Sequence, residues 1–134
     1  MTIDLEIVSP EKLLLSKAVD MVVLPAAEGE MGVLPGHAPM IVLLRGGTIR
    51  LTVGGSVTDM LYVSGGFAEV TTTRVTVLAN EATEVSELRK AEGESRLVAA
   101  QAEYDAADKM NTDALDVAMA KLQSARALIE AAAA

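Results

Sequence analysis

The sequence contains no cysteine and no tryptophan, and it has only one histidine, one phenylalanine and two tyrosines. The absence of cysteine excludes disulfide bonds, thiol catalysis and cysteine-ligated zinc, and it suits a reducing compartment. Because aromatic side chains are scarce, the interior has to be filled by Val, Leu, Ile and Met. We therefore expect an aliphatic core and no thiol chemistry.

Basic residues are also scarce, since 11 Lys and Arg stand against 19 Asp and Glu and give a formal net charge of -8. Nucleic-acid binding needs clustered Lys and Arg that displace counterions from phosphates, so we expect no nucleic-acid partner. No apolar run approaches the roughly 20 residues that cross a bilayer, and the N-terminus lacks a basic segment followed by an apolar one. We expect no direct insertion into a membrane.

Proline is missing from the C-terminal part of the chain, where Gly93 is the only glycine. From Thr83 onward Ala, Glu, Leu, Lys and Arg dominate, and these residues favour helix. Residues 1–82 are instead rich in Val, Leu, Gly and Thr. The change in composition predicts an all-β plus α protein, with a β domain over residues 1–82 and helices over residues 83–134.

Short β-prone runs separated by turn residues fill the predicted β domain. Thr2 to Ser9 alternates apolar and polar residues, which is typical of a strand buried on one face. Met40 to Leu44 is apolar at every position, so we expect it to be covered on both faces. Eight to ten such runs predict a two-sheet sandwich or a flattened barrel.

A β-hairpin is predicted where Gly54-Gly55 joins Thr48–Val53 to Ser56–Val63, because both glycines tolerate positive φ. In the simplest register Arg50 lies opposite Asp59. The same register places four apolar side chains on one face, namely Ile49, Leu51, Val53 and Met60.

The segment from Leu24 to Met40, LPAAEGEMGVLPGHAPM, holds three prolines, three glycines, two glutamates and the single histidine. Proline fixes φ and glycine permits positive φ, so we expect a rigid, repeatedly turning segment in place of a helix or flat strand. A rigid surface segment loses little entropy on binding, which suits a contact with a partner.

Beyond Thr83 the apolar period changes to 3.6 residues, and two apolar stripes predict an antiparallel helical hairpin. The polar link Asp108–Thr112 separates the stripes, with Asn111 or Thr112 available as N-cap of the second helix. The small residues of the first stripe predict a hairpin that is weak alone. The stripes are Leu88, Ala91, Ser95, Val98, Ala102 and Ala106, then Leu115, Ala118, Met119, Leu122, Ala125 and Ile129.

Three motifs, in this order and spacing, resemble one known family. They are EGEMGVLPGHAP at Glu28–Pro39, YVSGGFAEV at Tyr62–Val70 and RVTVLANEA at Arg74–Ala82. Followed by a helical hairpin, they are similar to the epsilon subunit of the rotary F-type ATP synthase over nearly the whole chain. The first two motifs are specific, since such a loop some twenty-five residues before a Ser-Gly-Gly strand start is hard to obtain by chance.

This resemblance implies a ten-stranded β-sandwich with a C-terminal two-helix hairpin, in a subunit that is not itself catalytic. In that family the sandwich binds the gamma subunit and rests on the membrane ring of c subunits, so that all three rotate together during proton-driven ATP synthesis. It also implies a peripheral location at a membrane. Because a transit peptide is lacking, we expect the cytoplasmic face of the bacterial inner membrane, with a plastid-encoded chain as the alternative.

Site residues follow from the same resemblance. It assigns a c-ring contact to Glu28, Gly29, Glu30 and Met31, and a gamma contact to His37. On the residues alone, a His37 ring that packs against neighbouring prolines and bonds to the backbone is an equal alternative.

The hairpin departs from the family's pattern. Members that bind regulatory ATP carry an Ile/Leu-Asp-x-x-Arg-Ala motif, and at the aligned positions only Val85 and Arg89 match. We therefore expect an ordinary helix start capped by Ser86, and no cofactor. The second helix, which in the family can reach the alpha and beta subunits, offers only Lys121 and Arg126 as basic contacts. We predict weak inhibition of ATP hydrolysis or none.

Two other classes of protein are open on the residues alone. An enzyme has little support, because the sequence has neither a glycine-rich nucleotide motif nor a Gly-x-Ser-x-Gly nucleophile motif. A free-standing binding module with a helical dimer seam is the stronger alternative, since the stripe from Leu115 to Ile129 suits a coiled coil equally well.

Overall fold

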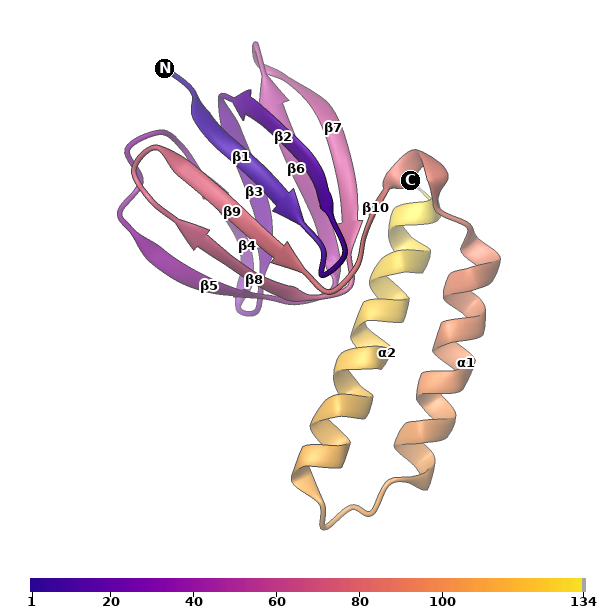
Figure 1. Cartoon of the computed structure of the whole chain (residues 1–134). Coiled ribbons are helices and arrows are strands. Elements are labelled where there is room, and N and C mark those ends of the chain that lie inside the picture. Colours follow the sequence, from indigo (N-terminus) through magenta and orange to yellow (C-terminus); the bar gives the residue numbers. More distant parts are fainter. Residues whose placement is uncertain (134) are drawn as a thin grey trace.

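Ten strands are followed by a short 3-10 helix and two α-helices in the computed structural model, which describes residues 1–133 (Figure 1). The order confirms the predicted β-sandwich followed by two helices. The strands are β1 (Ile3–Val8), β2 (Leu13–Val19), β3 (Met21–Ala26), β4 (Gly29–Val33), β5 (Met40–Leu44), β6 (Gly47–Val53), β7 (Ser56–Val63), β8 (Gly66–Val70), β9 (Arg74–Ala79) and β10 (Ala82–Glu84).

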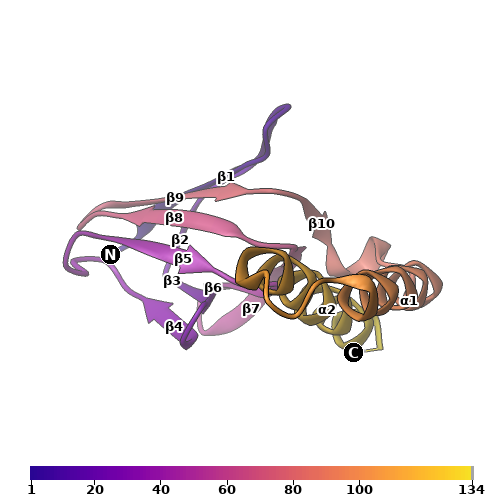
Figure 2. The ribbon, with the colours of Figure 1, turned by 90° about the horizontal axis from the view of Figure 1, so that it is seen from below.

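The strands join in the order β10-β7-β6-β3-β5-β8-β9-β1-β2, and β4 pairs with β3. The sheet folds over itself, so that β5, β8 and β9 lie in one layer and β6 and β7 in the other (Figure 2). Alternate residues enter the space between the layers, as Ile3, Leu5 and Ile7 of β1 do. Among the described residues, this core cluster consists of Ile, Leu, Val and Ala, which confirms an aliphatic core.

The register predicted for the β6–β7 hairpin is correct for its first two pairs and wrong from Leu51 onward. Val53 does lie opposite Ser56, but a register shift between Leu51 and Thr52 places Arg50 opposite Met60. The shift also moves Met60 off the predicted common face, because Met60 is exposed while Ile49 and Leu51 are fully buried. Val53 is exposed as well, at the end of β6 next to the turn. An extra residue in one strand reverses the faces of the residues beyond it, and composition does not reveal such a bulge.

The segment from Leu24 to Met40 contains more strand than predicted. β3 continues to Ala26 and pairs with β4 as an antiparallel hairpin whose turn is Ala27-Glu28. Pro25 is tolerated because it lies beside β4 at the end of the pairing, and Gly29 adopts φ 140°. The turning part of the segment is therefore confined to residues 27–28 and 34–39.

The helical part begins later than predicted. Val85–Glu87 forms the 3-10 helix, and α1 spans Lys90–Ala106. Ser86 lies inside the 3-10 turn and caps nothing, because Arg89 is the N-cap residue of α1 and makes no side-chain cap bond. α2 spans Thr112–Ala133, and the Asn111 side chain accepts a hydrogen bond from the Ala114 amide at 3.1 Å. The predicted N-cap at Asn111 is confirmed.

The stripe predicted on α1 is wrong, whereas the stripe on α2 is largely confirmed. Gly93 and Ala100 are the buried residues of α1, and Val98 is exposed. A Cβ on Gly93 would lie 2.7 Å from Ile129 Cγ1, so the helices meet where one of them has no side chain. The buried residues of α2 are Ala118, Leu122, Ala125, Leu128 and Ala131. Because α1 and the sandwich cover them, this stripe is not a free dimer seam.

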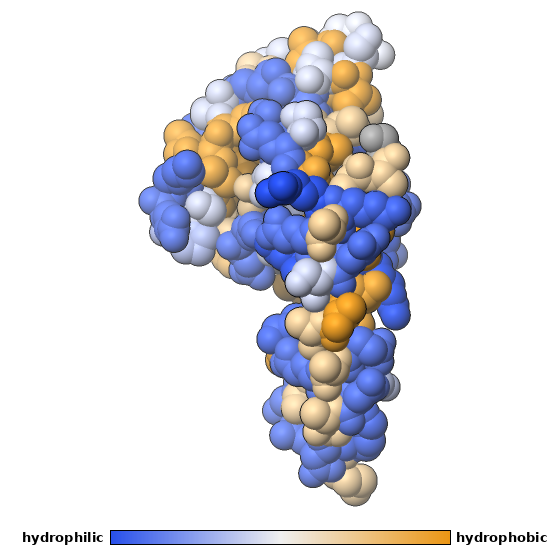
Figure 3. Space-filling model, turned by 90° about the vertical axis from the view of Figure 1, so that its right-hand side faces the viewer, coloured by the Kyte–Doolittle hydropathy of each residue, from blue (hydrophilic) through white to orange (hydrophobic). Residues whose placement is uncertain are grey.

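The hairpin projects away from the sandwich, with hydrophilic side chains along both edges of the face in Figure 3. β10 pairs with β7 through Ala82, Thr83 and Glu84, so the sheet continues past residue 82. The division into residues 1–82 and 83–134 stays a prediction, with β10 lying across it.

Candidate partner-docking surfaces

One outer face of the sheet carries a continuous line of apolar side chains. Leu43 pairs with Phe67, and Phe67 pairs with Leu78 on the next strand. Val8 continues this line from Leu78 across β1 and pairs with Leu13 of β2. We call these five residues, on β5, β8, β9, β1 and β2, the apolar row.

The apolar row is open to solvent. Leu43 is 67% exposed, Phe67 45% and Leu78 39%, and the neighbouring Ile41 is 73% exposed. The prediction that Met40 to Leu44 is covered on both faces is therefore wrong for the chain alone, because Met40, Ile41 and Leu43 are exposed. Contiguous exposed apolar surface of this kind marks an interaction site in a soluble protein.

The β3–β4 turn borders this surface. Its predicted ring-contact residues Glu28, Gly29, Glu30 and Met31 line a hollow of about 500 Å³ together with Ile41 and Leu43. The Glu28 side chain is exposed and Met31 packs partly against the core.

Glu30 is the one carboxylate of this turn that is engaged within the chain, because Arg50 Nη1 lies 2.8 Å from its Oε2. The Arg50–Asp59 pair predicted from the sequence is thus replaced by two others, Arg50–Glu30 and Lys17–Asp59, the latter at 2.6 Å. Lys17 of the terminal strand β2 reaches Asp59 of β7 and so helps to close the sandwich.

His37 lies at the opposite end of β5 from the β3–β4 turn, half-buried in the loop before Met40. Its Nδ1 is 2.8 Å from the Ala38 carbonyl oxygen, and its amide donates to the Leu34 carbonyl at 3.1 Å. The backbone bond expected of a structural histidine is present. The Gly36 amide donates to the Thr72 carbonyl at 2.8 Å, which holds the loop against the β8–β9 turn, at the opposite end of β8 from Phe67.

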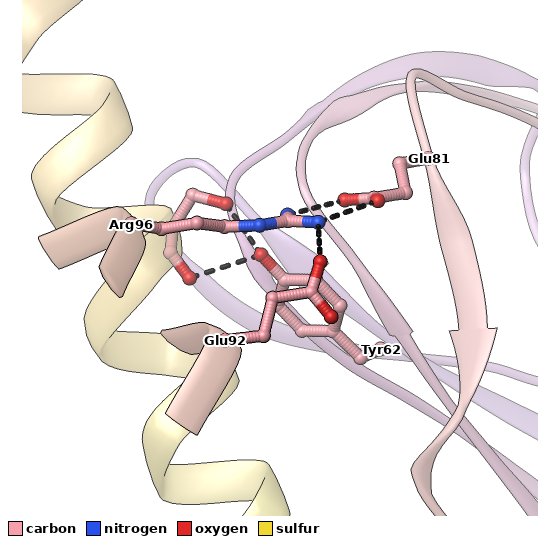
Figure 4. Close-up of polar contacts among 5 residues, drawn as sticks. Tyr62, Glu81, Glu92 and Arg96 are labelled. Atoms are coloured by element: carbon pink, nitrogen blue, oxygen red, sulfur yellow. Dashed lines mark hydrogen bonds and ion pairs between the residues drawn. The ribbon is translucent and has the colours of Figure 1, made fainter. Parts of the chain in front are cut away.

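A second group of polar contacts joins the sandwich to the hairpin (Figure 4). The buried Tyr62 of β7 donates its hydroxyl hydrogen to the Ser124 carbonyl oxygen of α2 at 3.0 Å, and the hydroxyl oxygens of the two residues are hydrogen-bonded at 2.6 Å. Burial raises the pKa of Tyr62 above its ordinary value, and the hydrogen bond to Ser124 opposes that rise. Gln123 accepts from the Gly46 amide at 2.9 Å and donates to the Gly46 carbonyl at 2.6 Å.

Arg96 of α1 supplies the ionic part of this interface. Its guanidinium donates to both oxygens of Glu81, at 2.6 and 2.9 Å, and to Glu92 at 2.6 Å (Figure 4). These bonds lower the pKa of the Glu81 carboxyl below its ordinary value, against the opposing effect of burial, and they raise the pKa of Arg96. A bidentate Arg–carboxylate pair fixes geometry as well as charge, so it orients α1 on the sandwich.

The residues of the degenerate nucleotide motif are not brought together. Val85 and Ser86 line a shallow hollow with Thr58 and Asp59, whereas Arg89 is exposed and does not line it.

The two basic residues of α2 are placed differently. Lys121 Nζ is 3.0 Å from Glu103 of α1. Arg126 is exposed and lines a hollow beside Arg45, Arg50 and Glu130. In this arrangement Lys121 is occupied within the hairpin and Arg126 faces solvent.

Within residues 1–133 there is no group of three or more side chains suited to a metal ion, and no helix is long and apolar enough to cross a membrane.

The sequence pattern of the family "ATP synthase, Delta/Epsilon chain, beta-sandwich domain" matches residues 2–85. The ATP synthase epsilon chain of Granulibacter bethesdensis is 65% identical over 128 residues, covering 96% of this chain and 95% of that one. The chain belongs to the ATP synthase epsilon family. A second epsilon chain, from Gluconacetobacter diazotrophicus, is 54% identical over 132 residues, covering 98% of this chain and 94% of its own length.

Solved structures agree with this assignment to the epsilon family. A chain of the Euglena gracilis mitochondrial ATP synthase, in an assembly of OSCP, F1 and c-ring, matches with a TM-score of 0.78 and 27% identity, covering 99% of this chain and 82% of that one. A chain from the central stalk and c-ring of the Tetrahymena thermophila mitochondrial ATP synthase matches with a TM-score of 0.68 and 12% identity, covering 98% of this chain and 97% of that one. It shows the same fold.

The sequence motifs point to the β3–β4 turn and His37, whose partner contacts stay predictions, and they do not point to the apolar row or the hairpin interface. The row was detectable in part, since every position of Met40 to Leu44 is apolar in an otherwise alternating β domain. The contacts of Arg96, Gln123 and Tyr62 join residues up to 77 positions apart, and nothing local in the sequence marks them.

Proposed function

We propose that this epsilon chain couples the gamma subunit to the c-ring in the rotor of an F-type ATP synthase, and that gamma binds the apolar row. The observation that carries the proposal is the row itself, five registered apolar positions on an exposed sheet face. Burying such a row against a partner releases water from several large apolar side chains, each worth about 1.5–3 kcal/mol when fully buried. His37, in the loop before Met40, adds a second gamma contact at the opposite end of β5 from Leu43.

The β3–β4 turn is the proposed c-ring contact, through Glu28, Gly29, Glu30 and Met31. Arg50 holds Glu30 at 2.8 Å and so fixes the turn, while Glu28 projects freely towards a partner. A turn braced in this way transmits torque with little loss of entropy on binding. Because the turn and Leu43 line one hollow, the two contacts lie side by side.

The chain itself carries no chemical step in this proposal. It acts as a non-catalytic, peripheral subunit on the cytoplasmic face of the bacterial inner membrane. The hairpin inhibits ATP hydrolysis weakly or not at all, because Lys121 is paired with Glu103 and Arg126 is the one remaining basic side chain of α2.

The test is the affinity of the full chain for purified gamma. Phe67→Asp places a charge in the middle of the row, and we expect the Kd to rise by at least about tenfold. Val57→Asp is the matched control, since Val57 is exposed on β7 and lies outside the row, and its affinity should match that of the unaltered chain. Unchanged binding of the Phe67→Asp variant would refute docking on this face.

A further inference from the structure

Met119 of α2 occupies a position where the apolar period predicts burial, yet it is 55% exposed. It lines a hollow of about 680 Å³ together with Leu43 and Phe67 of the apolar row. Its neighbours Ala118 and Leu122 are buried in the hairpin. Figure 2 shows α2 beside the end of β5, where this hollow lies. The apolar surface of the sandwich is thus continuous with one side of α2.

The position of Met119 depends on the attachment of α2 to the sandwich. Gln123, one helical turn further on, makes two hydrogen bonds to Gly46, and the adjacent Ser124 binds Tyr62. A Cβ on Gly46 would lie 2.5 Å from Ser124 Cα, so the strand link and the helix backbone are in close contact. Met119 is therefore held next to the apolar row only while the hairpin lies against the sandwich.

The hollow is also unusual in charge. Among the described residues that line it there is no Asp or Glu, although the chain carries a net charge of -8, and Arg45 is its one charged side chain. Charged residues are depleted at the centre of protein–protein interfaces. A hollow free of carboxylates, continuous with the apolar row, has the character of an interface centre.

We propose that Met119 and this hollow complete the gamma-binding surface, so that gamma binds the sandwich and α2 together. The inference rests on the proposed docking of gamma on the apolar row. It adds a consequence for regulation, because gamma then binds more tightly to the chain whose hairpin lies against the sandwich. By linkage, bound gamma favours that position of the hairpin by the same factor.

The experiment compares the gamma affinity of three full-length chains: unaltered, Met119→Asp and Met110→Asp. Met110 is exposed in the link between the helices and does not line the hollow, so it is the matched control. We expect the Kd to rise about tenfold for Met119→Asp and to stay unchanged for Met110→Asp. Hydrogen exchange of the Gly46 amide, which is bonded to Gln123, reports whether the hairpin is still attached.

The expected exchange pattern has two parts. In the free chain the Gly46 amide should exchange equally slowly in the unaltered protein and in Met119→Asp. Gamma should slow it further in the unaltered chain and not in the variant. If the Met119→Asp substitution detaches the hairpin in the absence of gamma, the Met119→Ala variant is used in its place. For that variant we expect the Kd for gamma to rise about threefold.

This inference would be overturned if Met119→Asp bound gamma as tightly as the unaltered chain while Phe67→Asp bound gamma more weakly. Docking of gamma on the apolar row would then still hold. Unchanged affinity of Phe67→Asp would instead refute the docking proposal. The unaltered chain could instead self-associate. If Met119→Asp abolished that self-association and left the gamma affinity unchanged, a second copy of the chain would cover the hollow and the inference would likewise be overturned.

Discussion

Gly93 illustrates how a single residue can have opposite meanings in the sequence and in the structure. In an isolated helix a glycine costs about 1 kcal/mol relative to alanine. Here it is buried where α1 meets α2, and an added Cβ would lie 2.7 Å from Ile129 Cγ1 and 2.9 Å from Leu128 Cδ2. The close approach of the two helices therefore requires the residue that weakens one of them.

Gly93→Ala should destabilise the hairpin despite the better helix propensity of alanine. Overpacking costs about 1–3 kcal/mol, against a gain of about 1 kcal/mol in propensity. We expect a net loss of up to about 2 kcal/mol, measured as the free energy of unfolding of α1 and α2 by hydrogen exchange. Ala102→Gly, at an exposed position of α1, is the control and should show the propensity cost alone. A more stable Gly93→Ala hairpin would contradict the close packing described above.

At the scale of elements, three sets of polar contacts fix the geometry of the hairpin on the sandwich. Arg96 binds Glu81, Gln123 binds Gly46, and Tyr62 binds Ser124. Polar contacts with water-accessible neighbours contribute modest net stability, so such an attachment is specific in geometry yet easily reversed.

The Glu81–Arg96 pair makes the attachment dependent on pH. Because the pKa of Glu81 is lowered in the folded chain, its contribution is fully present above the ordinary value of 4.5 and is lost as the pH falls through the lowered pKa. Glu81→Gln should destabilise the attached hairpin by about 1 kcal/mol at pH 7, since the carboxylate is partly exposed. The difference from the unaltered chain should disappear well below pH 4.5.

Gly46 amide exchange measures this effect at each pH, and Glu103→Gln is a suitable control because its pair with Lys121 lies within the hairpin. If the stability difference between Glu81→Gln and the unaltered chain were the same at pH 7 and at low pH, the Glu81–Arg96 ion pair would be excluded as its cause.

At the scale of the whole molecule, the two proposed contacts occupy adjoining surfaces of a sandwich that has no buried charge among its described residues. In the proposal, the apolar row provides the area that gamma would bury and the braced β3–β4 turn provides the shape that the ring would contact. The hairpin extends from the same side, where α2 meets β5. A partner that binds the apolar row can therefore also contact the hairpin, and its affinity can depend on the position of the hairpin.

Removing the hairpin should change ATP hydrolysis little. A chain ending at Glu84 keeps β10 and lacks both helices, including Lys121 and Arg126. We expect ATP hydrolysis by the complex to be similar with this chain and with the full-length chain, because Lys121 and Arg126 are the only two basic side chains of α2. Gamma binding by the shortened chain is the control, and a several-fold rise in hydrolysis would show that the hairpin inhibits.

The sequence by itself determined the class of fold, the aliphatic core and the family. These follow from local patterns, namely alternation of apolar residues, the change of period at Thr83 and the motifs at Glu28–Pro39 and Tyr62–Val70. The N-cap at Asn111 was predictable for the same reason, because its hydrogen bond joins residues three positions apart.

Only the tertiary structure decided which faces are covered and which side chains pair. A bulge after Leu51 redirected Arg50 to Glu30 and Asp59 to Lys17, and the seam at Gly93 displaced the predicted α1 stripe. The apolar row exists because five strands drawn from three separate parts of the sequence are in register. Register and close approach depend on contacts between distant segments, and local composition carries no information about them.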